Sequence, residues 1–158
     1  MKITEKKHRL PLNLYKGKRI ANFTFCIKNR EAVFTNSSTV ETFIKILKEE
    51  HEKAFCLNWA YVFMPDHLHI VSEGILEKSD LWKMATIFKK RTGFWFSKNC
   101  ESIKWQKDFY DHIHRKDEDL KKHIKYILEN PLRKSLIQEW KDYKFAGSLN
   151  FGIEEIIE

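Results

Sequence analysis

Two histidines placed two residues apart are the first feature of this sequence that could carry chemistry. They lie in the stretch YVFMPDHLHI, residues 61–70, where His67 and His69 flank Leu68 directly after a Pro-Asp turn. In a β-strand, residues i and i+2 project from the same face. The two imidazoles would therefore lie side by side, with Leu68 pointing to the opposite face, toward the core. Two imidazoles in this arrangement can bind one divalent metal ion.

The spacing alone does not single out a metal site, because the sequence contains it twice. His112 and His114 form a second pair with the same separation. Two histidines on a solvated strand face also arise without any function. A metal site at His67 and His69 therefore needs support from other residues.

That support lies in a predicted helix over residues 117–130. Projected at 100° per residue, this helix has an apolar face that should pack on a sheet and a polar face that carries Tyr126 and Asn130 one turn apart. A tyrosine hydroxyl can attack a phosphodiester if a metal ion polarises the phosphate. The simpler alternative is that Tyr126 is an ordinary exposed tyrosine and that Asn130 ends the helix before Pro131.

The elements that would position these residues alternate along the chain. The sequence predicts strands at 19–28, 54–63, 67–73 and 104–115, and helices from a cap at 36–38 to about residue 51, after an N-cap at Ser79, and over 117–130. This β-α-β-β-α-β-α order predicts an α+β, ferredoxin-like (split βαβ) fold. Its antiparallel sheet would carry helices on one face, and an added C-terminal helix would bear the tyrosine.

Length and composition predict one domain over residues 1–158, with its core at about 15–150, because no linker or repeat divides the chain. The 29 Lys and Arg against 22 Asp and Glu give a net charge of +7, which favours a polyanion such as nucleic acid as partner. No apolar run is long enough for a membrane span, and the N-terminal stretch MKITEKKHRL has no apolar signal region. Three widely spaced cysteines, at 26, 56 and 100, predict reduced thiols in a cytoplasmic protein.

Two stretches resemble a known family. MPDHLHIV is similar to the HUH motif (histidine, hydrophobic residue, histidine) of the single-tyrosine transposases. The stretch WQKDFYDHIHRKDEDLKKHIKYILENPLRKSLI, residues 105–137, resembles the REP-associated tyrosine transposases, a branch related to insertion-sequence 200/605 elements. EWKDYKFAGSLNF, residues 139–151, is similar to the tail of that branch. The similarity covers about residues 15–150.

The resemblance implies a single-stranded DNA endonuclease and strand transferase that acts with Mg²⁺ or Mn²⁺ on hairpin-forming repeats. Its paired metal ligands would be His67 and His69, and Asn130 would complete the coordination. Tyr126 would be the nucleophile that forms a 5′-phosphotyrosine link and leaves a free 3′-OH. The resemblance also implies a bacterial, nucleoid-associated protein that is a monomer or a homodimer.

The sequence departs from the family pattern at two places, and other functions stay open. Asp66 stands where relatives commonly carry Asn or Glu, and the tail reads AGSLNF instead of a serine-rich form. One alternative is a non-catalytic ferredoxin-like module that binds nucleic acid and retains a vestigial HUH site. Another is a plain metal-binding or metal-hydrolysing domain, which would leave Tyr126 and the positive charge unexplained.

Overall fold

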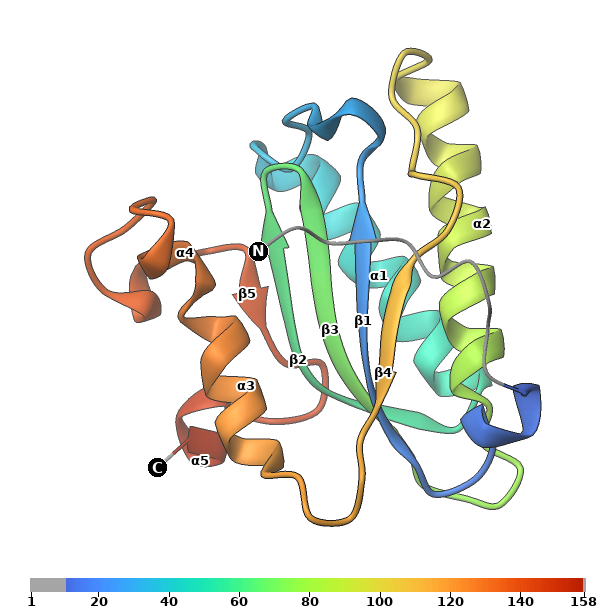
Figure 1. Ribbon diagram of the computed structural model, residues 1–158. Coiled ribbons are helices and arrows are strands. Elements are labelled where there is room, and N and C mark those ends of the chain that lie inside the picture. Colours follow the sequence, from blue (N-terminus) through green and yellow to red (C-terminus); the bar gives the residue numbers. More distant parts are fainter. Residues whose placement is uncertain (1–10, 158) are drawn as a thin grey trace.

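The computed structural model describes residues 11–157, and its centre is a five-stranded antiparallel sheet (Figure 1). The prediction that residues 1–10 contain no apolar signal region lies outside the described residues. The strand order across the sheet is β4-β1-β3-β2-β5, so β3 is the central strand, between β1 and β2. The strands are β1 (Ile20–Cys26), β2 (Cys56–Met64), β3 (His67–Gly74), β4 (Tyr110–Ile113) and β5 (Ala146–Gly147).

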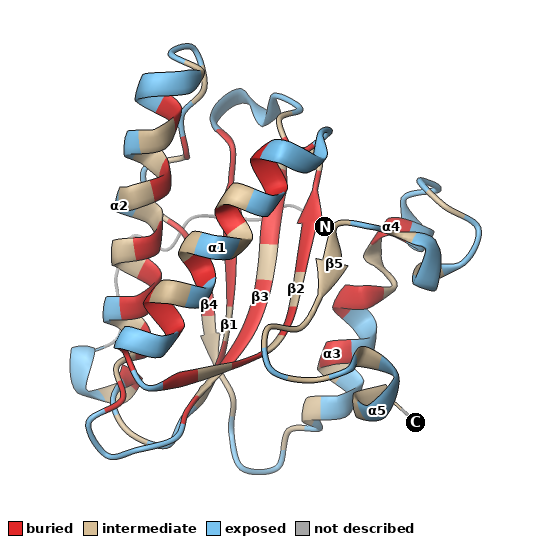
Figure 2. Ribbon diagram, turned by 180° about the vertical axis from the view of Figure 1, so that it is seen from behind, coloured by how far each residue is buried: buried red, intermediate tan, exposed pale blue. Residues whose placement is uncertain are grey.

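Helices cover both faces of the sheet. Two long helices, α1 and α2, lie on one face, and α3 lies on the other (Figures 1 and 2). This arrangement confirms the predicted α+β, ferredoxin-like fold with an added C-terminal helix. The helices are α1 (Ser37–Lys53), α2 (Leu81–Asn99), α3 (Leu120–Leu128), α4 (Asn130–Arg133) and α5 (Ile153–Ile157), with short 3-10 turns at Leu12–Tyr15, Lys28–Arg30 and Trp140–Asp142.

The pleat of the β2–β3 hairpin separates the histidines from the leucine between them. Leu68 pairs with Phe63 across the hairpin, and both are fully buried in the large core under α1 and α2. His67 pairs with Met64 and His69 pairs with Val62. Met64 and Val62 belong to the smaller core on the other face, so the two histidines project toward the side that α3 covers.

The two cores differ in size and in composition. The core under α1 and α2 is large and aromatic, with Phe25, Phe43 and Trp105 among its packed rings. In Figure 2 the buried residues run along the central strands and the inward sides of these two helices. The core under α3 is smaller, and Ile124, Ile127 and Leu128 are its buried helical residues. This agrees with the apolar face predicted for this helix.

The predicted N-cap of α2 is wrong by one residue. Asp80 caps the helix, and its carboxylate accepts the backbone N–H of Lys83. Ser79 is buried, and its hydroxyl instead accepts the backbone N–H groups of Ile75 and Leu76. A serine can satisfy backbone donors in the preceding loop as well as in a helix, so the two positions could not be separated by sequence.

The fourth strand is much shorter than the predicted range 104–115. Only Tyr110–Ile113 pair regularly with β1, while Trp105 forms an isolated bridge with Ile27. The indole of Trp105 enters the aromatic core and donates to the hydroxyl of Thr92 at 2.8 Å. The segment around Trp105 thus packs against α2 and stays bonded to the chain after β1 only through this bridge region.

Pro131 does not end the helical region as predicted. The helix α3 ends at Leu128, and Pro131 then lies in the first turn of the short helix α4. Proline is tolerated there because the first helical N–H groups have no partner within the helix. Two short elements near the C-terminus, β5 and α5, were not predicted.

The three cysteines are free, with Cys26 and Cys56 buried and Cys100 half-buried. This agrees with the prediction of reduced thiols. Within residues 11–157, no helix combines the length and the hydrophobicity that crossing a membrane requires.

Candidate functional site

The side chains of His67 and His69 meet at the start of β3. Their Nε2 atoms are 3.1 Å apart, and their ring planes are nearly perpendicular. Neighbouring ligands in an octahedral site with bonds of about 2.1 Å lie about 3 Å from each other. The two nitrogens therefore have a separation that suits one shared metal ion.

The opposite nitrogen of each ring is held by a neighbour. Nδ1 of His67 lies 2.6 Å from the carboxylate of Asp66, and Nδ1 of His69 lies 3.0 Å from the hydroxyl of Thr24 on β1. When each Nδ1 carries the ring proton, the lone pair of each Nε2 is left for a metal. A partner at the far nitrogen is the usual means by which proteins orient metal-binding histidines.

Asp66 is in turn held by Arg30, whose Nε donates to the second carboxylate oxygen at 2.8 Å. Burial acts to raise the pKa of Asp66, but its contacts with His67 and Arg30 lower it overall. The carboxylate is therefore charged at neutral pH and fixed at both oxygens. This gives a physical role to the residue at which the sequence departs from the family pattern.

Both imidazoles are neutral at neutral pH. Burial lowers the pKa of His67, although Asp66 opposes this effect. Burial also lowers the pKa of His69 to about 3, and the positive charges of Arg133 and Arg30 add to that shift. Neutral imidazole is the form that binds a metal. The same cationic neighbours would attract an anionic group such as a phosphate.

Helix α3 packs on the face of the sheet to which the two histidines point. Ile127 and Leu128 pack in the same small core as Met64 and Val62, which are the β2 partners of His67 and His69. The helix is capped by Asp119, whose side chain accepts the backbone N–H of Lys122. The structure thus brings the predicted tyrosine helix to the face of the sheet on which the histidines lie.

Tyr126 lies on the exposed side of this helix, with 60% of its surface accessible. Its ring stacks under the guanidinium of Arg133, with the Arg133 Cζ 3.8 Å from the ring centroid. Arg133 also donates to the backbone carbonyl of Tyr126 at 2.6 Å. Among the described residues, no hydrogen bond joins the Tyr126 hydroxyl to either histidine, so the structure brings the helix but not the hydroxyl to the pair.

Asn130 is half-buried at the first position of α4. Its backbone carbonyl accepts the N–H of Lys134 at 3.0 Å. Within residues 11–157, its side-chain amide has no hydrogen-bond partner. Arg133 and Lys134, on the same short segment, act electrostatically on His69 and His67, so this segment lies near the histidine pair.

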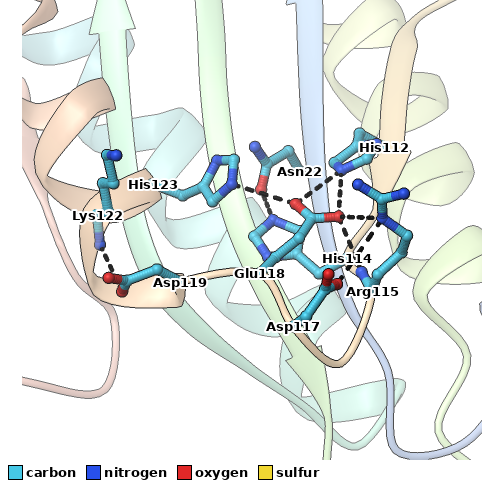
Figure 3. Close-up of polar contacts among 9 residues, drawn as sticks. All are labelled: Asn22, His112, His114, Arg115, Asp117, Glu118, Asp119, Lys122 and His123. Carbon is cyan, nitrogen blue, oxygen red and sulfur yellow. Dashed lines mark hydrogen bonds and ion pairs between the residues drawn. The ribbon is translucent and has the colours of Figure 1, made fainter.

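The second histidine pair has a different setting. His112 lies on β4 and His114 directly after it, and both face Glu118 and His123 near the start of α3 (Figure 3). Burial and the neighbouring His123 lower the pKa of His114 to about 4. These four side chains form a cluster separate from the His67–His69 pair.

The sequence did not reveal the residues that support the first pair. Thr24 is one polar residue in an apolar strand, and Arg30 and Arg133 are two of 29 basic residues. Only the strand pairing of Thr24 with His69 could have indicated one of them. That pairing depends on the order of strands in the sheet.

Comparison with known proteins agrees with the resemblance found in the sequence. Residues 17–131 match the family described as "Transposase IS200 like". The chain is 28% identical over 127 residues to the REP-associated tyrosine transposase of Escherichia coli strain K12. The matched region covers 78% of this chain and 73% of that protein. It is also 28% identical over 101 residues to a "Putative REP-associated tyrosine transposase" of Haemophilus influenzae, with 56% of each chain covered.

The fold is also similar to that of a solved tyrosine transposase structure. A solved structure described as a REP-associated tyrosine transposase bound to a REP hairpin superposes with a TM-score of 0.73 at 20% sequence identity, covering 89% of this chain and 81% of the other. The predicted similarity to REP-associated tyrosine transposases is therefore confirmed. Since the family match covers strands β1 to β4, the histidine pair and the helix that carries Tyr126, the chain belongs to the IS200-like transposases, a family of DNA-processing enzymes.

Proposed function

We propose that this protein is a metal-dependent endonuclease and strand transferase for single-stranded DNA, and that its substrate contains a hairpin. The observation that carries the proposal is the His67–His69 pair. Two neutral imidazoles present their Nε2 atoms to one point, 3.1 Å apart, on the side of the sheet that helix α3 covers. A transposase that only bound DNA would not need this arrangement.

His67 and His69 would bind Mg²⁺ or Mn²⁺ together with the amide oxygen of Asn130. Asn130 is suited to this role because its side chain is half-buried, is unpaired among the described residues and lies four residues after Tyr126. The bound ion would polarise the scissile phosphate and leave coordination positions for its oxygens. Asp66 and Thr24 would keep both rings in the metal-binding orientation.

Tyr126 would be the nucleophile. Its hydroxyl oxygen would form a bond to the scissile phosphorus, and the bond from phosphorus to the 3′ oxygen would break. The products would be a 5′-phosphotyrosine and a free 3′-OH. Attack by a 3′-OH on the phosphotyrosine reverses these steps and joins strands, so no nucleotide cofactor is needed. The exposed position of Tyr126 allows access to the backbone of a bound strand.

The charges near the pair favour a phosphate at this place. Arg30 and Arg133 both contribute to the low pKa of His69, and Lys134 acts on His67 in the same direction. A phosphate group between these cations would gain attraction from each of them. This local group accounts for part of the net positive charge of the chain.

The test is to incubate the full chain with an end-labelled single-stranded DNA hairpin and Mn²⁺. We expect a covalent protein–DNA adduct on a denaturing gel, no adduct with Tyr126→Phe, and none when EDTA is present. Equal products from wild type and Tyr126→Phe would refute Tyr126 as the nucleophile. Hairpin binding without any adduct would instead favour the non-catalytic module.

A further inference from the structure

A second group of metal-ligating side chains lies outside the proposed active site. Three histidines surround the carboxylate of Glu118 where β4 passes into α3 (Figure 3). One ligand atom each from His114, Glu118 and His123 lies within 4.8 Å of the others. The imidazole of His112 also contacts the carboxylate, with its Nε2 2.9 Å from Oε1.

The two ring nitrogens of His114 differ in a way that points to a ligand. Its Nε2 lies 2.6 Å from the side-chain oxygen of Asn22 on β1. An amide oxygen only accepts hydrogen bonds, so Nε2 carries the proton and Nδ1 has a bare lone pair. This Nδ1 is buried and has no hydrogen-bond partner among the described residues. A buried polar atom of this kind is rare in native proteins and needs an explanation.

The carboxylate of Glu118 is held in place from several sides. The backbone N–H of Arg115 donates to Oε1 at 2.9 Å, and Nε2 of His123 lies 3.1 Å from Oε2. Only 12% of the Glu118 side chain is exposed. The rings of His114 and His123 lie beside it, with centroids 4.6 Å apart. An acid and two imidazoles thus converge on one small volume.

We propose that His114, Glu118 and His123 form a binding site for a divalent transition metal such as Zn²⁺, separate from the His67–His69 pair. Zinc commonly takes two histidines and one carboxylate with bonds of about 2.0–2.1 Å, which places tetrahedral ligand atoms about 3.3 Å apart. The three ligand atoms lie within 4.8 Å of one another, so they would move closer together on binding the ion. Asn22 orients His114 through its far nitrogen, and His112 holds the carboxylate.

The position of this site gives it a structural role. His114 follows the edge strand β4, Asn22 lies on β1, and His123 lies on α3, three residues before Tyr126. A metal ion here links the sheet to the helix that carries the proposed nucleophile. This link adds to the small apolar core, which otherwise joins α3 to the sheet.

The experiment uses the full chain with the first pair removed. In metal-free His67→Ala/His69→Ala protein, we expect Co²⁺ to bind at one ion per chain with visible absorption bands, and Zn²⁺ to displace it. In the same background, His114→Ala, His123→Ala and Glu118→Gln should each weaken binding by about 100-fold or more, since loss of a mere outer-shell partner weakens metal affinity by about 10- to 100-fold. No DNA is present, so the result is independent of the proposed function.

Asp117→Asn is the matched control for Glu118→Gln. It removes the same charge one residue away, from a side chain that is 83% exposed and whose ion-pair partner Arg115 lies 3.9 Å away, and it should leave Co²⁺ affinity unchanged. Far-UV circular dichroism verifies the fold of each variant. If His114→Ala does not fold, His123→Gln, at a 37% exposed side chain, makes the same test. Two results would overturn the proposal: absence of stoichiometric Co²⁺ binding to the His67→Ala/His69→Ala protein, or a Co²⁺ affinity in the His114 and His123 variants equal to that of this parent protein.

Discussion

The two His-x-His pairs of this protein have the same spacing but opposite surroundings. His67 and His69 start a central strand, and each ring is oriented from behind so that both Nε2 atoms converge. His112 lies near the end of an edge strand and His114 directly after it, and both turn toward Glu118 instead of toward each other's nitrogens. The first pair has cations nearby, whereas the second has a carboxylate at its centre. The neighbours of a histidine pair, rather than its spacing, therefore decide its chemistry.

This difference suggests two kinds of metal site. The first pair lies near the cations Arg30 and Arg133, which would attract an anionic ligand. In the second cluster the protein itself supplies the negative charge, through the carboxylate of Glu118. The predictions below test this contrast.

The largest expected effect separates the two pairs by DNA cleavage. We expect His69→Ala to lower the rate of adduct formation in Mn²⁺ by at least about 10³-fold, because the metal would lose one of its two imidazole ligands. We expect His114→Ala to lower it by no more than about 10-fold. The measurement is a single-turnover gel assay at saturating protein. Similar losses in both variants would remove the functional distinction between the pairs.

His51 lies outside both histidine pairs and serves as a comparison for the effect of burial alone. His51 is buried, and both of its ring nitrogens have partners in the Leu47 carbonyl and the Ser72 hydroxyl. Burial lowers its pKa from 6.5 to about 4. The unfolded chain thus binds the proton more tightly, so the stability that neutral His51 contributes is complete above pH 6.5. As the pH falls from 6.5 toward 4, the free energy of unfolding therefore decreases by roughly 3 kcal/mol.

Urea unfolding between pH 7 and pH 4 measures this loss. The variant His51→Gln should have lower stability at pH 7 and a flatter pH dependence than wild type. Its Co²⁺ binding should not change, since His51 contacts neither histidine cluster. An unchanged pH dependence in His51→Gln would assign the acid sensitivity to other groups.

Asp66 provides a sharper test of the first pair. We expect Asp66→Ala to weaken Mn²⁺ binding by about 10- to 100-fold, because His67 loses the partner that orients its ring. Asp66→Asn should have a smaller effect, since an amide oxygen can still accept the Nδ1 proton. Mn²⁺ affinity measured by electron paramagnetic resonance ranks the variants. Equal affinity of wild type and Asp66→Ala would mean that the carboxylate does not orient the ligand.

The smallest expected effect concerns Arg133, which stacks on the Tyr126 ring. Removing an exposed cation–π contact of about 0.5–1 kcal/mol corresponds to a factor of about 2 to 5. We therefore expect Arg133→Ala to slow adduct formation by about this factor, with a further contribution from the lost charge near His69. The control is Lys125→Ala, which removes an equal charge from the residue directly before Tyr126 on α3. An equal loss in both variants would show that only net charge matters.

The sequence by itself determined the order of the main elements and which side chains share a face. The alternation of His67, Leu68 and His69 predicted which side chains enter the large core, and the 3.6-residue period of α3 predicted that Tyr126 lies away from the apolar stripe. These features follow from local backbone geometry, which a single segment specifies. The motif order also predicted the family that the comparison then confirmed. The metal-binding roles of His67, His69 and Asn130 and the nucleophilic role of Tyr126 stay predictions.

Only the tertiary structure decided how distant segments combine. Thr24, Arg30 and Asp66 meet around the histidine pair because β1 pairs with β3 and the turn after β1 folds back on the hairpin. Asn22, His114, Glu118 and His123 meet because β4 pairs with β1 and the chain then crosses to α3 on the same face. Among these contacts, Arg30 and Asp66 are 36 positions apart, and Asn22 and His114 are 92 positions apart. No periodicity within one segment encodes them, because they depend on strand order and on which face of the sheet a helix covers.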